Sequence, residues 1–137
     1  MKRTIRYLFI MFITLVGCAG LGNKSYLLQD GYSVMYISVY NAKLIYDETG
    51  TNTSGSTVIP EMVVRINEND RYIIAEQELL KRGKPTGEYT YWIEDKLNRT
   101  IVGRALDFDD FQNQLSELSI KDLELLDVKT FPVLEES

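Results

Sequence analysis

The sequence predicts an α+β domain, with an antiparallel sheet of about five or six strands in hairpins and one C-terminal helix packed on it. Three observations lead to this prediction. Apolar residues alternate at a period of two in residues 32–40. Two pairs of segments rich in β-branched and aromatic residues flank short polar turns. One segment, residues 107–118, carries apolar residues at helical spacing instead.

The first 17 residues have the organisation of a secretory signal peptide. Residues 1–6 carry three positive charges and no acid, and residues 7–16 are apolar except for Thr14. A membrane-spanning helix needs about 20 apolar residues. The run therefore has the length of a signal core and is too short for a permanent transmembrane anchor.

Leu15-Val16-Gly17-Cys18 matches the lipobox of bacterial prolipoproteins at each of its four positions. The match implies thioether lipidation of Cys18, cleavage between Gly17 and Cys18, and acylation of the new amino group, for example with palmitate. Cys18 is the only cysteine, and its thiolate is the nucleophile that accepts the lipid. One acyl chain anchors only marginally, so two chains on Cys18 would hold the protein stably. The alternative is a buried core cysteine behind an ordinary signal peptide.

We expect four regions along the chain. Residues 1–17 are the signal peptide and residues 18–25, which are small, polar and rich in glycine, are a lipidated tether. Residues 26–128 form a single globular domain, since the 120 residues that follow the cleavage site fit one domain. Residues 129–137 contain Pro132 and end in polar side chains, which predicts a flexible tail.

Charge and composition exclude several classes of function. The signal peptide holds three of the 15 Lys and Arg and none of the 20 Asp and Glu, so the remainder carries 12 basic and 20 acidic residues, a net charge of −8. Such a domain repels nucleic acid. The chain has no histidine, which excludes serine–histidine catalysis and histidine-containing zinc sites. We expect no catalytic residue, no metal and no cofactor, and the domain is predicted not to be an enzyme.

A turn at Asp30-Gly31 precedes the first strand of the alternating segment. One face of residues 32–40 carries Tyr32, Tyr36 and Tyr40. Two interpretations of this tyrosine face stay open. It is either a stacking surface for a glycan or peptide, or a face covered by a helix or a second layer, with the hydroxyls reaching water at the rim.

The next segments alternate between strands and loops. Lys43–Tyr46 continues as a second strand or as the far side of a bulge. Residues 49–57 contain only Gly, Ser, Thr and Asn, which predicts a loop. This loop resembles a phosphate-binding loop, but Ser56 stands where that motif requires its lysine. Nucleotide binding is therefore not expected.

Two further hairpins are predicted, and each has two strands around a polar turn. Their strands are Met62–Ile66 with Arg71–Ala75, and Tyr89–Ile93 with Thr100–Val102. Glu76–Lys81, between the two hairpins, is polar and compatible with a helix. Trp92 is the only tryptophan, and we interpret it as a core anchor in preference to a ligand platform.

Residues 107–118 form the predicted helix, with Phe108, Phe111, Leu115 and Leu118 on one face. Asp107 is a natural N-cap, and the acids at positions 109 and 110 suit the first turn. A calcium loop is the alternative interpretation, but the glycine and glutamate that it requires at its sixth and twelfth positions are absent. We expect a turn and a short closing strand in residues 120–128.

The chain resembles a family of small uncharacterised bacterial lipoproteins, domain of unknown function 3997. The resemblance covers most of the domain and rests on the lipobox, Asp30-Gly31-Tyr32-Ser33, Arg71-Tyr72-Ile73-Ile74-Ala75, Tyr91-Trp92-Ile93, and Phe111 with Leu115 and Leu118. Family members often have Gly-Pro after the last hairpin strand, whereas Gly103 is followed by Arg104 here. The resemblance implies no known activity and therefore no catalytic residue.

These observations predict a lipoprotein anchored on the extracytoplasmic face of the bacterial cell membrane, or in the outer membrane of a cell that has two. The first hypothesis is a binding or structural module of the cell envelope that contacts a protein or a wall polymer. The second is a membrane-tethered immunity or inhibitor protein, whose acidity suits a basic toxin or hydrolase. The third is a wall hydrolase that uses carboxylates, for which no acid and base pair can be assigned.

Overall fold

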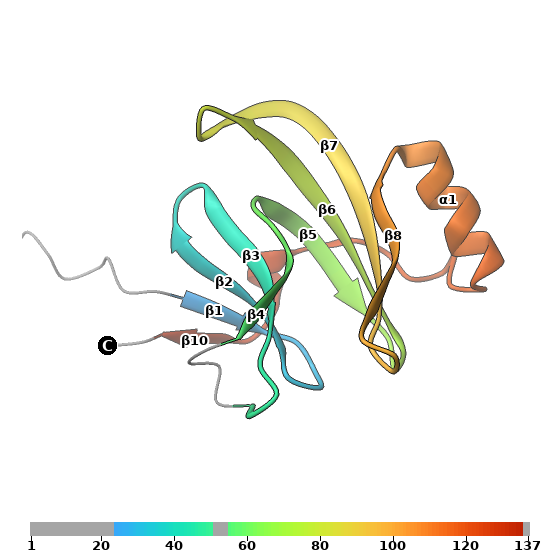
Figure 1. Cartoon of the computed structure of the whole chain (residues 1–137), viewed down its shortest axis with the longest axis horizontal. Helices are drawn as coiled ribbons and strands as arrows, with labels where there is room; N and C mark the ends of the chain where they lie inside the picture. Colours follow the sequence, from blue (N-terminus) through green and yellow to red (C-terminus); the bar gives the residue numbers. More distant parts are fainter. Residues whose placement is uncertain (1–23, 51–54, 136–137) are drawn as a thin grey trace, which may run out of the picture.

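The computed structural model describes residues 24–50 and 55–135 (Figure 1). The predicted signal peptide, Gly17 and Cys18 lie outside these residues. No helix in the described part of the chain is long and apolar enough to cross a bilayer. The predicted α+β fold is confirmed, but the strands form two antiparallel sheets of five instead of one sheet.

The first sheet has the strand order β10-β1-β2-β3-β4. Its first four strands in the sequence follow one another as antiparallel neighbours, and the last strand of the chain completes its outer edge. The strands are β1 (Lys24–Leu27), β2 (Tyr32–Ser38), β3 (Asn41–Tyr46), β4 (Ser56–Ile59) and β10 (Val133–Glu135).

The second sheet has the strand order β8-β7-β6-β5-β9 and contains both predicted hairpins. The segment Glu76–Lys81 is not helical, because it continues β6 and pairs with the first half of β7 in a long hairpin. The strands are β5 (Val63–Glu68), β6 (Tyr72–Lys81), β7 (Lys84–Asp95), β8 (Thr100–Leu106) and β9 (Leu126–Asp127).

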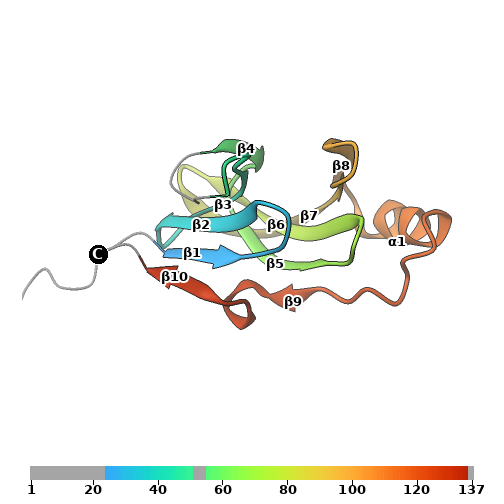
Figure 2. The same ribbon diagram turned by 90° about the horizontal axis from the view of Figure 1, so that it is seen from below.

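Helix α1 (Phe108–Glu117) lies beside β7 and β8, on the side of the second sheet that faces away from the first (Figures 1 and 2). Asp107 caps it as predicted, since its carboxylate accepts a hydrogen bond of 2.8 Å from the backbone N–H of Asp110. Phe111 and Leu115 are buried, and the ring of Tyr91 stacks on Phe111 with centroids 4.8 Å apart. Phe108, predicted on the same face, is 54% exposed.

The C-terminal segment joins the two sheets. The short strand β9 confirms the predicted closing strand and adds to the edge of the second sheet beside β5. The chain then makes a short 3-10 helix, Val128–Thr130, and returns as β10 beside β1. The predicted flexible tail is therefore wrong for residues 133–135, and the predicted tether 18–25 already includes the start of β1. Neither β1 nor β10 was predicted, because both are short and β10 pairs only with β1, from the other end of the chain.

The main core lies between the two sheets. It contains Tyr32, Val34 and Leu44 from the first sheet and Ile66 and Trp92 from the second, all buried. The tyrosine face of β2 thus faces inwards, and a second layer covers Tyr32 and partly covers Tyr36. Tyr40 lies in the turn after β2 and is 44% exposed. The interpretation that a second layer covers the tyrosine face therefore holds for Tyr32 and partly for Tyr36, but not for Tyr40.

A buried lysine fastens the two sheets at one end of the sandwich. Lys96, in the β7–β8 turn, donates to Glu68 Oε1 at 2.8 Å and to Asp30 Oδ2 at 3.1 Å. Asp30 belongs to the β1–β2 turn of the first sheet, and Glu68 ends β5 in the second. Glu68 also accepts a hydrogen bond from the backbone N–H of Gln29. This end of the molecule is therefore closed by charged contacts.

Candidate functional site

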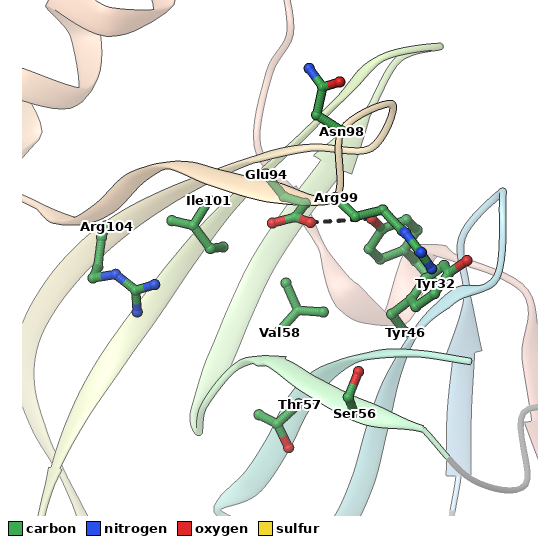
Figure 3. A pocket seen from close by; sticks show the side chains of 10 residues that line it. All are labelled: Tyr32, Tyr46, Ser56, Thr57, Val58, Glu94, Asn98, Arg99, Ile101 and Arg104. Carbon is green, nitrogen blue, oxygen red and sulfur yellow. Dashed lines mark hydrogen bonds between the residues drawn. The ribbon is translucent and has the colours of Figure 1, made fainter. Parts of the chain in front are cut away.

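A cleft of about 540 Å³ opens between the two sheets on the side where β4 and β8 form the sheet edges (Figure 3). Ser56, Thr57 and Val58 of β4 line one wall. β8 and the turn before it line the other wall, while Tyr32 and Glu94 lie at its base. The opposite side of the sandwich is the one that the C-terminal segment follows. The cleft therefore lies on the side of the sandwich away from β9 and β10.

The base of the cleft holds a buried carboxyl group. Glu94 is 3% exposed, and the Tyr32 hydroxyl donates a hydrogen bond of 3.2 Å to its Oε1. Burial raises the pKa of Glu94, the neighbouring Asp95 raises it further, and the hydrogen bond from Tyr32 opposes the change. The pKa of Tyr32 is raised too, mainly by burial and then by the charge of Glu94. Tyr32 thus stays a hydrogen-bond donor throughout the physiological pH range.

Two arginines line the cleft on either side of Glu94 (Figure 3). The Arg99 guanidinium lies 4.7 Å from the centre of the Tyr46 ring, and that of Arg104 lies 5.4 Å from the Trp92 ring. Stacking on an aromatic face orients a guanidinium and leaves its N–H donors free. Within residues 24–50 and 55–135, neither arginine forms an ion pair with a carboxylate. Both can therefore bind an anion.

The turn that carries Arg99 is held by Asp95. This carboxylate accepts hydrogen bonds from the backbone N–H of Leu97 at 3.0 Å and from the side-chain amide of Asn98 at 2.9 Å. Arg71 lies 3.1 Å away and lowers the pKa of Asp95, with a further contribution from Asn98. Arg99 itself has φ +49°, a left-handed conformation that the turn requires. The turn that carries Arg99 is thus fastened by hydrogen bonds to the Asp95 carboxylate.

The chemistry of the cleft suits recognition of an anion. It offers two guanidinium groups and the hydroxyls of Ser56 and Thr57. Its one carboxyl group, Glu94, has a raised pKa, which favours the neutral form that does not repel an anion. Glu94 is the only Asp or Glu that lines it, so the described cleft contains no carboxylate pair of the kind a glycosidase uses. No group of three metal-ligating side chains occurs in the described residues.

Sequence patterns alone did not identify this site. Of the three tyrosines considered as a binding surface, Tyr32 is at the base of the cleft, and Tyr36 and Tyr40 are not in it. Glu94, Arg99 and Arg104 were missed, since none of them belongs to a recognised motif and they lie in or beside two different strands of a hairpin. One sequence signal could have pointed to the site. Glu94 directly follows the apolar run Tyr91-Trp92-Ile93, and a charged residue that extends such a run is a candidate for a buried position. Gly17 and Cys18 lie outside the described residues.

In residues 24–50 and 55–135, fold and site together define a small two-sheet β-sandwich with one α-helix and a polar cleft at its open edge. The model of the family "Protein of unknown function (DUF3997)" matches residues 29–129, and the chain belongs to this family. The match starts after β1 and ends before β10, so the strand pair that links the two ends of the domain lies outside it. Searches of curated proteins and of solved structures find no match.

Proposed function

We propose that this protein is a lipid-anchored binding module of the bacterial envelope, whose cleft accepts the anionic groups of a polymer outside the membrane. The observation that supports the proposal is the pair Arg99 and Arg104, which have no ion-pair partner in the described residues. The chain as a whole has a net charge of −5. Two unpaired cations in one cleft of an acidic protein point to an anionic ligand.

The spacing of the two arginines favours a ligand with repeated charges. Arg99 lies in the turn before β8 and Arg104 lies in β8, and the two side chains stand on either side of Glu94 (Figure 3). Two guanidinium groups on opposite sides of a buried carboxyl group suit a ligand that offers a separate anionic group to each of them. A phosphodiester polymer carries anionic groups in series, separated by neutral and polar units that suit the hydroxyls of Ser56 and Thr57.

Lipid anchoring is the second part of the proposal and rests on Leu15-Val16-Gly17-Cys18. Lipid on Cys18 keeps the domain at the membrane surface, where its cleft can contact a wall polymer. Cys18→Ala removes the acceptor for the lipid, and we expect this variant to leave the membrane fraction. A variant that stays in the membrane fraction unchanged would contradict this part of the proposal.

The ligand is tested with short oligomers of poly(glycerol phosphate) and with uncharged polyglycerol of matched length. The full chain is purified in detergent and its thermal unfolding is followed with each probe. Binding to the native state stabilises it by about 2.7 kcal/mol at a ligand concentration 100 times the Kd. We expect the phosphate polymer to raise the Tm, and the neutral polymer to leave it unchanged.

Variants locate the binding site. Arg99→Gln and Arg104→Gln should each reduce the affinity for the phosphate polymer about tenfold, because each removes charge-assisted hydrogen bonds. Lys121→Gln is the matched control, since it removes an exposed positive charge after α1, away from the cleft. If all three variants weaken binding equally, the polymer responds to net charge and the cleft is not its site.

A further inference from the structure

The two long hairpins of the sandwich project at the same end of the molecule, and the chain enters the domain there. β1 starts at Lys24, which pairs with Tyr36 near the tip of the β2–β3 hairpin. The opposite end is closed by Lys96, which contacts the β1–β2 turn. β6 and β7 leave that closed end and turn back at Arg82-Gly83, so the tip of their hairpin also lies at the entry end (Figures 1 and 2).

The tip of the β2–β3 hairpin is apolar and exposed. Val39 is 77% exposed, Ile37 52% and Tyr40 44%. Two-residue hairpin turns usually carry Asn, Gly or Asp, whose backbone preferences the turn requires. Val39 and Tyr40 do not have these backbone preferences, so the turn itself does not explain why they stand there. Its exposed apolar surface therefore calls for a contact outside the domain.

The tip of the β6–β7 hairpin is cationic. Lys81 pairs with Lys84 across the turn, and Arg82 stands between them, all three exposed. Arg82 and Gly83 have φ of +54° and +74°, which gives the left-handed pair of a tight hairpin turn. Within the described residues none of the three cations forms an ion pair. Three cations without an ion-pair partner among the described residues therefore gather on one tight turn of an acidic chain.

We propose that these two tips form a membrane-contact surface, in which Ile37, Val39 and Tyr40 enter the lipid headgroup region and Lys81, Arg82 and Lys84 contact anionic lipids. This inference rests on the lipid anchor of the proposed function. Six residue steps separate Cys18 from Lys24, which limits the distance between their Cα atoms to about 20 Å. An anchor this short brings the entry end, with both tips, towards the bilayer.

The chemistry of the two tips fits the two zones of a membrane surface. Aliphatic side chains and tyrosine partition into the boundary between headgroups and acyl chains, with the tyrosine hydroxyl in the polar layer. Lysine and arginine are attracted to anionic headgroups within about one Debye length. With the tips on the membrane, the cleft between β4 and β8 lies along the side of the domain and stays open to a polymer.

The experiment places a single reactive thiol at the tip. Lipidated Cys18 is blocked as a thioether, so Val39→Cys gives the full chain one free thiol. Leu97→Cys is the matched control, because Leu97 is 76% exposed and lies in the β7–β8 turn at the closed end. Both lipidated proteins are placed on phosphatidylethanolamine vesicles with and without phosphatidylglycerol, and each thiol reacts with a membrane-impermeant maleimide.

We expect vesicles that contain phosphatidylglycerol to slow the reaction of Val39→Cys about tenfold relative to Leu97→Cys. Replacing Lys81, Arg82 and Lys84 by Gln together should restore the reaction rate of Val39→Cys and leave that of Leu97→Cys unchanged. If the two thiols react at equal rates while the protein is bound to the vesicles, the hairpin tips do not contact the membrane, and the lipid anchor is unaffected by this result. A protein that does not float with the vesicles would overturn the lipid anchor as well.

Discussion

At the scale of single residues, Gln77 is a buried polar side chain whose partners come from segments far away in the sequence. The Gln77 side-chain amide donates to the carbonyl oxygens of Pro60 and Glu61, and its oxygen accepts from Thr90 and Trp92. The interpretation of Trp92 as a core anchor is confirmed by its 5% exposure. Its partner could not be predicted, since Gln77 lies in the segment whose polarity indicated a helix.

Glu94 gives a prediction at this scale. Because burial raises its pKa above the ordinary 4.5, the native state holds the proton of Glu94 at pH values where the unfolded chain has released it. The contribution of Glu94 to stability is therefore fully present below the unfolded pKa and is lost as the pH rises through the folded pKa. Glu94→Gln keeps the oxygen that accepts from Tyr32 and removes the charge.

We expect Glu94→Gln to raise the free energy of unfolding at pH 7 by roughly 1 kcal/mol and to leave it nearly unchanged at pH 4. Urea unfolding of both proteins across this pH range measures the difference. Asp95→Asn serves as the contrast, because the pKa of Asp95 is lowered and its loss should destabilise most at neutral pH. A constant effect of Glu94→Gln at all pH values would contradict the assignment.

At the scale of elements, sequence patterns predicted the helices and strands that have local signals such as a cap or an apolar periodicity. They missed the strands that lack such signals. Helix α1 has an N-cap, acids in its first turn and apolar residues at helical spacing, all of which are local. The second half of β6 has none of these. It is a strand because β7 pairs with it along its length, which overrides a polar composition.

The N-cap of α1 provides the prediction for this scale. Asp107→Ala removes the acceptor for the Asp110 backbone N–H and should lower the free energy of unfolding by about 1 kcal/mol. Asp109→Ala is the control, since it removes an acid of the first turn that acts only through the helix dipole and should cost about 0.5 kcal/mol. Equal losses in urea unfolding would mean that the Asp107 side chain acts by charge alone and not as a cap.

At the scale of the whole molecule, the arrangement of two sheets around one core decides where the functional surfaces lie. The C-terminal segment follows one side of the sandwich, Lys96 closes one end, and the cleft and the two hairpin tips occupy the side and the end that remain. The two proposals, a polymer in the cleft and lipid at the tips, therefore use separate surfaces.

Lys96 tests how the sheets are fastened. Lys96→Met leaves the carboxylate of Glu68, whose side chain is 11% exposed, without its cation, and should lower the free energy of unfolding by about 2 kcal/mol. Lys43→Met is the matched control, because Lys43 and Glu61 are 3.7 Å apart and both partly exposed, and such pairs contribute about 0.5 kcal/mol. Similar losses in chemical denaturation would show that Lys96 does not fasten the two sheets.

The sequence alone determined the fold class, the two later hairpins, the helix with its cap at Asp107, and the expected lipid acceptor Cys18. Each of these depends on residues close together in the chain, where periodicity, turn chemistry and motif spacing act directly. Only the tertiary structure decided the division into two sheets, the β1–β10 pair, and the grouping of Glu94, Arg99 and Arg104 around one cleft. These depend on contacts between distant segments, which form because burying apolar faces between two layers outweighs the local preferences of the segments involved.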